Sequence, residues 1–503
     1  MQETVKQKYD SFFKTEHFKD DLKQKTLRGG VNTFGAEFFS FGFRIVSNII
    51  LARLLLPEHF GLIAMVTALT SIAERFKDLG LSSATVQRKV ISHEEVSTLF
   101  WINLGFGIIF MLLVASLSPL IAKFYSDKRL IGITLALSSG FVFGGLTVQH
   151  QALLRRQMYF GRLAAIQIIS DLSSLTLAII LALKGFGYWA LVVKEVMRSL
   201  MISIGTLSMC PWLPGKPQWT GSVFSMLRFG GHISGFNITY FLSRSLDQIL
   251  LGKFWGAGPL GFYKQAYQLM LVPISQLQFP VDRVAEPALS VLQSEPERYR
   301  QTYARIVSFL SIASMPLAVY LGIFSDNIIR LLFGDKWLNS APILQMLSIA
   351  AFIQPVASTC GFVMVTNGKS GRYLKWGICR AVCVCVAFAI GVKWGPIGVA
   401  KAYVANMYIT LFPSLWYGFK ETPISISLFL KAISLPSMIS IIMGIILFFS
   451  SKKFIWMSMK SQLIFSMLIS IFIYFILLCS IPAGRKLMRE HFSYAIGALK
   501  AAF

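Results

Sequence analysis

Charged side chains are scarce in this sequence: Asp, Glu, Lys and Arg make up 14% of its 503 residues, whereas an ordinary soluble domain has roughly 25%. Acidic residues are the scarcer kind, with 23 against 48 basic ones, so the net charge is +25. A nucleic-acid-binding protein can be equally basic, but it gathers its charge on one face instead of between long apolar runs. With 55% apolar residues, the composition excludes an ordinary water-soluble fold and predicts a membrane protein with no nucleic-acid partner.

Cysteine is scarce, and a nucleotide-binding loop and a cleavable leader segment are not expected. The six cysteines fall in or beside apolar stretches, so we expect neither a disulfide framework nor a metal site, and no cofactor. No GxxxxGK[ST] loop occurs, so the chain is not expected to hydrolyse ATP by itself. Residues 1–30 hold no short apolar core followed by a small-residue cleavage site, so we expect no removed signal peptide.

The apolar residues form long runs. Segment 108–117 (IIFMLLVASL) lacks the strict polar alternation of a membrane barrel strand, so the runs are predicted to be helices. A helix needs about 20 apolar residues to cross about 30 Å of hydrocarbon, and on this template we expect about fourteen spans. The fold class is therefore an all-α integral membrane protein. The spans lie near residues 31–56, 60–80, 97–121, 130–154, 163–183, 187–209, 222–252, 259–285, 305–325, 340–366, 372–392, 396–417, 426–450 and 462–481.

Helix-breaking and capping residues mark the connections between these spans. Pro57 and Pro119 are expected to lie at such connections. Ser92 and Glu95 have the spacing of a capping box, in which each side chain binds the backbone N–H of the other residue. These residues predict hairpins of helices joined by short turns.

Two pairs of similar segments indicate an internal duplication. IILARLLLPEHFG (49–61) and ILLGKFWGAGPLG (249–261) share a basic residue and a later glycine, and GFGYWALV (185–192) is echoed by KWGPIGVA (393–400). Two six-helix halves with the same direction in the membrane would explain this pattern, which is typical of transporters. The expected parts are a cytoplasmic tail, amphipathic or disordered (1–30), an N-terminal six-helix bundle (31–210), a linker (211–221), a C-terminal six-helix bundle (222–418), and two additional helices with a cytoplasmic tail (419–503).

Lysine and arginine are divided unevenly between the loops on the two sides of the predicted bundle. The side with the amino-terminal tail also holds Arg88, Arg155, Arg298 and Lys420 among many other bases, and the opposite side holds far fewer. Cytoplasmic loops carry the excess of positive charge. Both termini are therefore expected to face the cytoplasm.

Several segments are similar to one known family. TLRGGVNTFGAEFFSFGFRIVSNIILARLLLPEHFGLIAMV (26–66), DLGLSSATVQRK (78–89), LDQILLGKFWGAGPLGFYKQAYQL (246–269) and FGDKW (333–337) resemble the polysaccharide-transporter family of Wzx-type oligosaccharide flippases, within the multidrug/oligosaccharidyl-lipid/polysaccharide exporter superfamily. The resemblance implies a V-shaped pair of helical bundles and alternating access. It also implies export of an undecaprenyl-pyrophosphate-linked oligosaccharide across the bacterial inner membrane, for capsule, exopolysaccharide or O-antigen lipopolysaccharide. The sequence departs from many relatives at Ser245, where they carry Asn.

A multiply charged sugar head group needs a wet basic cavity to cross hydrocarbon, because an unpaired charge is expensive there. Ionisable residues well inside spans are therefore candidates for substrate binding, and the planar fork of arginine suits phosphate oxygens. The alternative for each base is a structural ion pair, such as Glu37 with Arg44 two turns away, or a side chain that reaches the membrane surface. The anion-binding candidates are Arg44, Lys194, Arg198, Arg244 and Arg380.

Acids inside spans are candidates for coupling transport to an ion gradient. Asp171 lies near the middle of the fifth span, where a desolvated carboxylate can load and release a proton, and the same oxygens could coordinate sodium. Its alternative is an Asp satisfied by neighbouring serine hydroxyls or by an arginine. Asp247 is three residues from Arg244 and matches an acid common in the relatives. The ion-coupling candidates are Asp171, Asp247 and Glu37.

Charges at the cytoplasmic ends of the second and eighth predicted spans have two readings. They are either solvated helix ends or gates that close by forming ion pairs. The gate candidates are Glu74, Arg75, Asp78, Asp282 and Arg283.

The predicted function is a secondary-transporter flippase and not an enzyme. Its ligands would be a lipid-linked oligosaccharide, membrane lipid and a coupling ion, with the polysaccharide polymerase machinery as a further partner. A drug or lipid exporter of the same superfamily is an alternative, although the buried bases favour an anionic cargo. A membrane polymerase or glycosyltransferase would need a large catalytic loop, whereas the longest external connection, about 326–340, is short. A purely structural partner would need no charges in its bundle interior.

Overall fold

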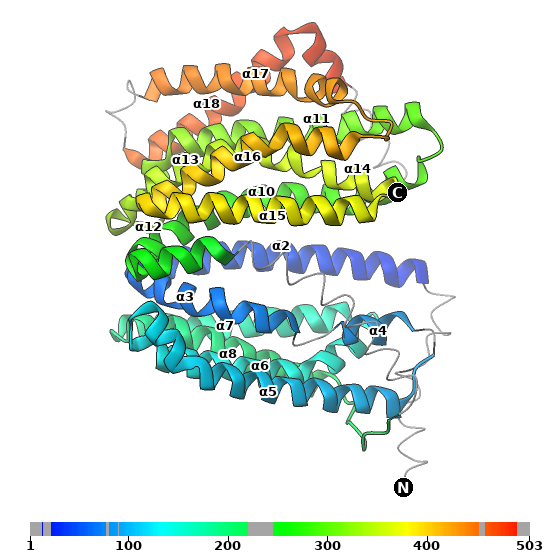
Figure 1. The fold of residues 1–503 in the computed structure, drawn as a ribbon, viewed down its shortest axis with the longest axis vertical. Helices are drawn as coiled ribbons and strands as arrows, with labels where there is room; N and C mark the ends of the chain where they lie inside the picture. The colour runs from blue at the N-terminus through cyan, green and yellow to red at the C-terminus, as the bar shows by residue number, and fades with distance from the viewer. Residues whose placement is uncertain are drawn as a thin grey trace. The chain divides into compact units, whose positions relative to one another are not determined.

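The computed structural model describes residue 13 and the ranges 22–76, 80–88, 90–219, 245–451 and 458–489. Every regular element within these ranges is a helix, as the long apolar runs predict, and Figure 1 shows their arrangement. The all-α fold class is therefore confirmed. The chain divides into two compact units, Met1–Gly261 and Phe262–Phe503, which are described separately.

The first unit consists of long helices joined by tight turns (Figure 1). α5 packs along α6, α7 packs along α8, α6 also contacts α8, and α2 packs against α7. A further helical stretch covers residues 245–255, and α10 begins at Ala257. The helices of this unit are α2 (Leu22–Leu54), α3 (Pro57–Phe76), α4 (Leu81–Gln87), α5 (His93–Tyr125), α6 (Arg129–Arg156), α7 (Phe160–Leu183) and α8 (Tyr188–Met209).

Two of the predicted helix signals are confirmed and one is wrong. Pro57 begins α3, and the capping box forms, with Ser92 N–H donating to Glu95 at 2.9 Å and Glu95 N–H donating to Ser92 at 3.2 Å. Pro119 does not end a helix but lies inside α5. Proline removes the backbone donor to the carbonyl four residues earlier, and here the Ser118 hydroxyl donates to that carbonyl, of Ala115, at 2.7 Å. Such replacement by a serine hydroxyl lets a membrane helix continue through proline.

The turns that follow α2, α5 and α7 gather at one end of the first unit. Arg129, at the start of α6, reaches Glu58 of α3 at 2.5 Å and Asp127 of the neighbouring turn at 2.7 Å. The ring of His59 lies 6.2 Å from that of Tyr188, at the start of α8. This end of the unit, defined by residues 55–59, 126–129 and 184–188, is called the turn end below.

The duplicated segments of the sequence meet in the first unit. A Cβ atom at Gly61 of α3 would collide with the backbone carbonyl of Ala257, and one at Gly261 of α10 would collide with that of Pro57. The first turns of α3 and α10 therefore pack backbone against backbone, which only glycine permits. The recurrence of Gly61 and Gly261 in the two similar segments thus has a structural reason.

At the opposite end, the segment after α8 is bound to the start of α5. Trp101 Nε1 donates to the Gly215 carbonyl at 2.8 Å, and the Gly215 N–H donates to Ser97 at 2.9 Å. Trp212 is fully buried and its indole donates to His93 at 3.0 Å. Residues 211–219 of the predicted linker are therefore attached to the first unit along their length.

The second unit is organised around α11, which packs against α13 and α17. α13 also contacts α16, α16 contacts α15, and α17 contacts α18. Buried Tyr299 and Tyr303 of α11 are satisfied by the hydroxyls of Thr366 at 2.6 Å and Thr359 at 2.9 Å. The unit contains most of α10 (Ala257–Val291), α11 (Pro296–Ile323), α12 (Ser325–Phe333), η2 (Asp335–Ser340), α13 (Ala341–Ser358), α14 (Cys360–Thr366), α15 (Ser370–Gly391), η3 (Val392–Trp394), α16 (Gly395–Phe419), α17 (Ile426–Ser451) and α18 (Met459–Ser480).

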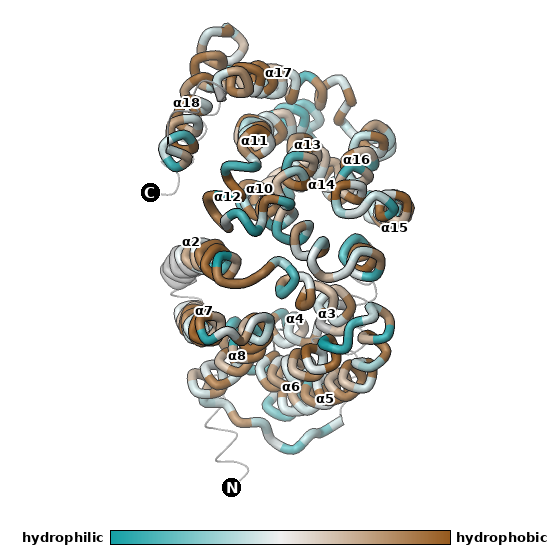
Figure 2. Tube along the Cα trace, turned by 90° about the vertical axis from the view of Figure 1, so that its left-hand side faces the viewer, coloured by the Kyte–Doolittle hydropathy of each residue, from teal (hydrophilic) through white to brown (hydrophobic). Residues whose placement is uncertain are grey.

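Many helices expose apolar faces that a bilayer would cover. Within the described ranges, eight helical segments are long and apolar enough to cross a membrane, and one of them, 370–419, contains both α15 and α16. Figure 2 shows hydrophobic residues predominating along α5 and α17. Leu112 of α5 and Phe472 of α18 are 59% and 66% exposed, and exposed apolar surface of this extent marks contact with lipid or protein. The protein is therefore a multi-pass membrane protein.

Candidate functional site

A half-buried ion pair joins α7 and α8 in the first unit. Arg198 Nε donates to Asp171 Oδ1 at 2.6 Å, and Gln167 Nε2 donates to Asp171 Oδ2 at 2.9 Å. The Asp171 side chain is only 8% exposed, whereas that of Arg198 is 34% exposed. Both carboxylate oxygens thus have a partner, which offsets the desolvation that an isolated carboxylate would suffer. This is the arginine-satisfied aspartate that the sequence left open as an alternative.

The pairing uses only one edge of the Arg198 guanidinium. Nε points to Asp171, and within the described part of the chain the two terminal nitrogens make no hydrogen bond or ion pair. Arginine presents five N–H donors in a fixed plane. Asp171 therefore orients Arg198 and leaves most of its donors available to a further acceptor.

Lys194 lies one helical turn from Arg198 on α8. Its Nζ is 4.0 Å from Glu195 Oε1, and the two side chains are 24% and 47% exposed. Side chains four residues apart on a helix share one face, so α8 presents two cations in sequence. With Glu195 and Asp171 included, the charges of this α7–α8 cluster balance.

Three of the predicted charges lie at a similar depth in the first unit. With a rise of about 1.5 Å per residue, Arg44 is about 15 Å along α2 from Leu54, Asp171 about 18 Å along α7 from Leu183, and Arg198 about 15 Å along α8 from Tyr188. These reference residues all border the turn end, and the hydrocarbon core is about 30 Å thick. The three charges are therefore near the middle of the spans. Arg44 is exposed and forms no ion pair with a described acid.

The remaining predicted site residues are scattered. Asp247 is 4% exposed and accepts the Gln248 N–H at 2.8 Å. Arg283 is exposed in the later part of α10, and Arg380 is exposed on α15 without an ion pair to any acid in the described ranges. The Arg244 and Asp78 positions, and the side chains of Glu37, Glu74, Arg75 and Asp282, lie outside the described residues.

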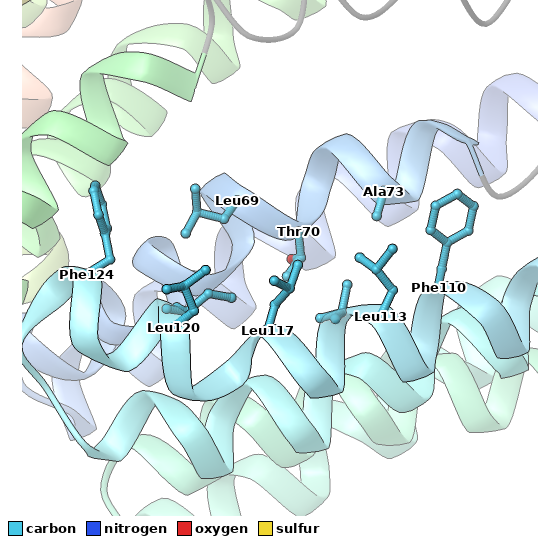
Figure 3. Close-up of a pocket in the computed structure, with 10 residues that line it drawn as sticks. Leu69, Thr70, Ala73, Phe110, Leu113, Leu117, Leu120 and Phe124 are labelled. Atoms are coloured by element: carbon cyan, nitrogen blue, oxygen red, sulfur yellow. The ribbon is translucent and has the colours of Figure 1, made fainter.

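An apolar groove between α3 and α5 was not predicted from the sequence. Figure 3 shows α5 side chains from Phe110 to Phe124 facing Leu69, Thr70 and Ala73 of α3. The groove has a volume of about 450 Å³, and among the described residues that line it Thr70 is the only polar one. The α5 side chains of the groove are Phe110, Leu113, Val114, Leu117, Leu120, Ile121 and Phe124. Their spacing of three and four residues was the sequence signal for an apolar face of α5.

A buried polar network in the first unit was also missed. Thr85 donates to the Gln149 side-chain carbonyl at 2.8 Å, and Gln149 donates to Asn103 at 3.2 Å. All three side chains are at most 1% exposed. The network connects α4, α5 and α6, and the amides inside two apolar runs were its signal. It is satisfied internally, which favours a structural role.

Comparison with known proteins identifies the class first from the fold. The chain is similar to "Lipid II flippase MurJ, inward closed conformation", with a TM-score of 0.72 and 17% identity, over 89% of this chain and 98% of that one. At this identity the likeness shows the fold alone: that of a polytopic helical membrane protein of the MurJ type.

Sequence comparison then identifies the family. Residues 50–342 match the family described as "Polysaccharide biosynthesis protein", and the chain belongs to this family. It is 27% identical to the lipopolysaccharide biosynthesis protein WzxC of Escherichia coli (strain K12) over 85% of this chain and 89% of the relative. It is 25% identical to the succinoglycan biosynthesis transport protein ExoT of Rhizobium meliloti (strain 1021), over 82% of this chain and 84% of that protein. The resemblance noted in the sequence is confirmed.

Proposed function

We propose that this protein is a flippase that moves a lipid-linked oligosaccharide across the bacterial inner membrane. The observation that carries the proposal is the family match over residues 50–342, joined to relatives named for polysaccharide biosynthesis and its transport. The chain is a transporter and not a catalyst. The substrate would be a polyprenyl-pyrophosphate-linked repeat unit for capsule, exopolysaccharide or lipopolysaccharide.

The proposed mechanism is alternating access between two helical bundles. About fourteen spans would form an N-terminal bundle (31–210) and a C-terminal bundle (222–418) in a V-shaped arrangement, with two further helices after them. The Lys/Arg bias of the loops supports cytoplasmic termini. On that orientation, the turn end of the first unit would face away from the cytoplasm.

Arg198 would be the central contact for the substrate phosphates. Its terminal N–H groups are not used by described residues, and charge-assisted hydrogen bonds to phosphate are the strongest that arginine makes. Lys194 lies on the same face of α8, and Arg44 lies at a similar depth. Arg244 and Arg380 would extend the anion site along the substrate's path.

Asp171 would compete with the substrate for Arg198. When a proton or sodium ion occupies the carboxylate, its attraction for Arg198 falls and the guanidinium can turn toward a phosphate; when the ion leaves, Asp171 takes Arg198 back. The 2.6 Å contact between the two side chains supports this exchange. Asp247 and Glu37 are further candidates for binding the coupling ion. Glu74, Arg75, Asp78, Asp282 and Arg283 would close the cytoplasmic side by ion pairs.

In cells, the function is tested by measuring whether lipid-linked repeat units accumulate on the cytoplasmic face of the membrane. In a strain that lacks its own transporter, the parental gene should restore surface polysaccharide. Arg44→Ala or Arg244→Ala should instead accumulate lipid-linked repeat units on the cytoplasmic face at normal protein levels. Export by both variants at the parental rate would remove the two arginines from the anion site.

The coupling role of Asp171 has its own test in membrane vesicles. Asp171→Asn should abolish the dependence of transport on an imposed proton or sodium gradient, since the amide keeps the shape but cannot carry the charge. An unchanged gradient dependence would exclude Asp171 from coupling.

The same vesicles test the alternative functions. Transport of a cationic drug in place of the lipid-linked sugar would favour a drug exporter. Co-purification of the polymerase machinery would identify it as a partner.

A further inference from the structure

The α3–α5 groove is apolar along its length and has a cation at one end. Along α5 the lining residues run from Phe110 to Phe124, a distance of about 21 Å at 1.5 Å per residue. Figure 3 shows the Phe124 ring at one extremity of the groove and Phe110 at the other. The Phe124 extremity lies beside the turn end, because α5 finishes one residue later, at Tyr125.

Lys253 is held directly over the Phe124 extremity. Its ammonium donates to the Phe124 carbonyl at 2.5 Å and lies 5.0 Å from the centre of the Phe124 ring. The position is within the range of a cation–π contact. A residue that lines the groove therefore also fixes a positive charge at its mouth.

The lysine at this mouth lacks an acidic partner among the described residues. Lys253 forms no ion pair with a carboxylate in the described ranges. The nearby acids are engaged elsewhere: Glu58 and Asp127 both bind Arg129, and the hydrogen bond from Arg129 holds the pKa of the Asp127 carboxyl below its ordinary value. The mouth thus carries positive charge that an anionic group could neutralise.

We propose that the α3–α5 groove binds the isoprenoid chain of a lipid phosphate, with the phosphate against the Lys253 ammonium at the Phe124 end. This inference rests on the proposed function, because such a lipid carries the oligosaccharide. A hydrocarbon chain matches the apolar walls, and the phosphate matches the charge at the mouth. On the proposed orientation, the site would hold the carrier lipid on the side to which the sugar is delivered.

The length of the groove favours an isoprenoid over a phospholipid chain. One leaflet provides about 15 Å of the hydrocarbon core, whereas the groove extends about 21 Å from its charged mouth. An acyl chain of an ordinary phospholipid spans a single leaflet in its average bilayer conformation. It reaches the Phe110 extremity only when fully stretched, which costs conformational entropy. A polyprenyl chain is long enough to fill the whole trough.

Lipid retention by the purified full-length protein tests the site. In nanodiscs of phosphatidylcholine, undecaprenyl phosphate is added and the lipid retained by the protein is counted by native mass spectrometry. Leu117→Trp should fill the trough and Lys253→Gln should remove the charge, and each should lower retention at least fivefold. The matched control for Leu117→Trp is Leu112→Trp, at an exposed α5 residue outside the lining. The control for Lys253→Gln is Lys128→Gln, at an exposed lysine of the turn end. Both controls should retain the parental amount of lipid.

Two results would overturn the site. Parental retention in both Leu117→Trp and Lys253→Gln would exclude the groove, and equal displacement by phosphatidylglycerol would show an ordinary lipid-facing furrow. Ala73→Leu narrows the trough from α3 and replaces Leu117→Trp if that variant unfolds. Failure of the proposed function is a separate outcome: the parental protein would then retain undecaprenyl phosphate in the groove but move no lipid-linked oligosaccharide in cells.

Discussion

Replacing Arg198 by Met would leave the Asp171 carboxylate buried without its cation. Breaking one side of a buried ion pair costs about 3–5 kcal/mol, because the remaining charge stays desolvated. Water reaches Arg198, whose side chain is 34% exposed, and Gln167 still donates to the other carboxylate oxygen. We therefore expect a loss at or below the lower limit, about 2–3 kcal/mol. Asp171→Asn added to Arg198→Met removes the orphaned charge and should restore most of this loss.

The assay is the midpoint of thermal unfolding in nanodiscs at a fixed heating rate, since membrane proteins of this size unfold irreversibly. The temperature shift per kcal/mol falls with chain length, so for this chain it should be about 1–2 °C per kcal/mol. Arg198→Met should lower the midpoint by about 2–6 °C on the same scale. Arg380→Met is the matched control, because it also removes an arginine inside a span but breaks no ion pair among the described residues. Its midpoint should stay at the parental value.

The double-mutant cycle decides whether the pair is coupled. Coupling requires the Asp171→Asn and Arg198→Met midpoint shifts to differ from additivity by about 2–4 °C, which corresponds to about 2 kcal/mol on the scale above. Independent sites add within about 0.5 kcal/mol. Additive effects would refute the inference that Asp171 holds Arg198. The orientation of Arg198 toward a substrate would then lose its structural basis.

Two further predictions concern packing and pH. Gly61→Ala should destabilise the first unit by about 1–3 kcal/mol, because its Cβ meets the Ala257 carbonyl. In Gly258→Ala the added Cβ meets nothing within 4 Å, so this control should keep the parental stability. Equal unfolding midpoints for the two variants would contradict the backbone packing of α3 on α10. Glu421 accepts a hydrogen bond from Lys369 at 3.0 Å, which holds the pKa of its carboxyl below the ordinary value of 4.5. The stabilisation of the loop by ionised Glu421 should be complete above pH 4.5 and be lost as the pH falls through the lowered pKa. Hydrogen exchange of the backbone at 419–425 should therefore rise in acid. Glu421→Gln should remove that pH dependence.

Hydropathy was sufficient to predict the helical fold, because a span must be long, apolar and internally hydrogen-bonded. The prediction of helix ends from proline failed where a neighbouring side chain replaced the hydrogen bond that proline removes. Pro119 was expected to end a helix, but the Ser118 hydroxyl supplies the hydrogen bond that proline removes from Ala115. Compensation of this kind depends on a side-chain rotamer, which a proline count does not contain.

Charges inside spans pointed to Asp171 and Arg198 individually but not to their pairing. The pairing follows from hairpin geometry: the two residues are about equally far from the turn between α7 and α8, so adjacent antiparallel helices place them at one depth. That relation was available in the sequence once the turn at 184–187 was predicted. The α3–α5 groove was not, because it depends on how α3 crosses α5 and on the Lys253 ammonium reaching Phe124 from a distant segment.

The most direct measurement is the transfer of a fluorescent polyprenyl-pyrophosphate oligosaccharide across proteoliposome membranes. The parental protein is compared with the stabilised double variant Arg198→Met/Asp171→Asn and with Lys184→Met, an exposed control at the end of α7. A hydrogen bond to a charged group contributes about 1.5–3 kcal/mol, so losing Arg198 should slow transfer about tenfold to a hundredfold. The control should transfer at the parental rate. Transfer by the folded double variant at the parental rate would contradict the account that Arg198 receives the substrate phosphate.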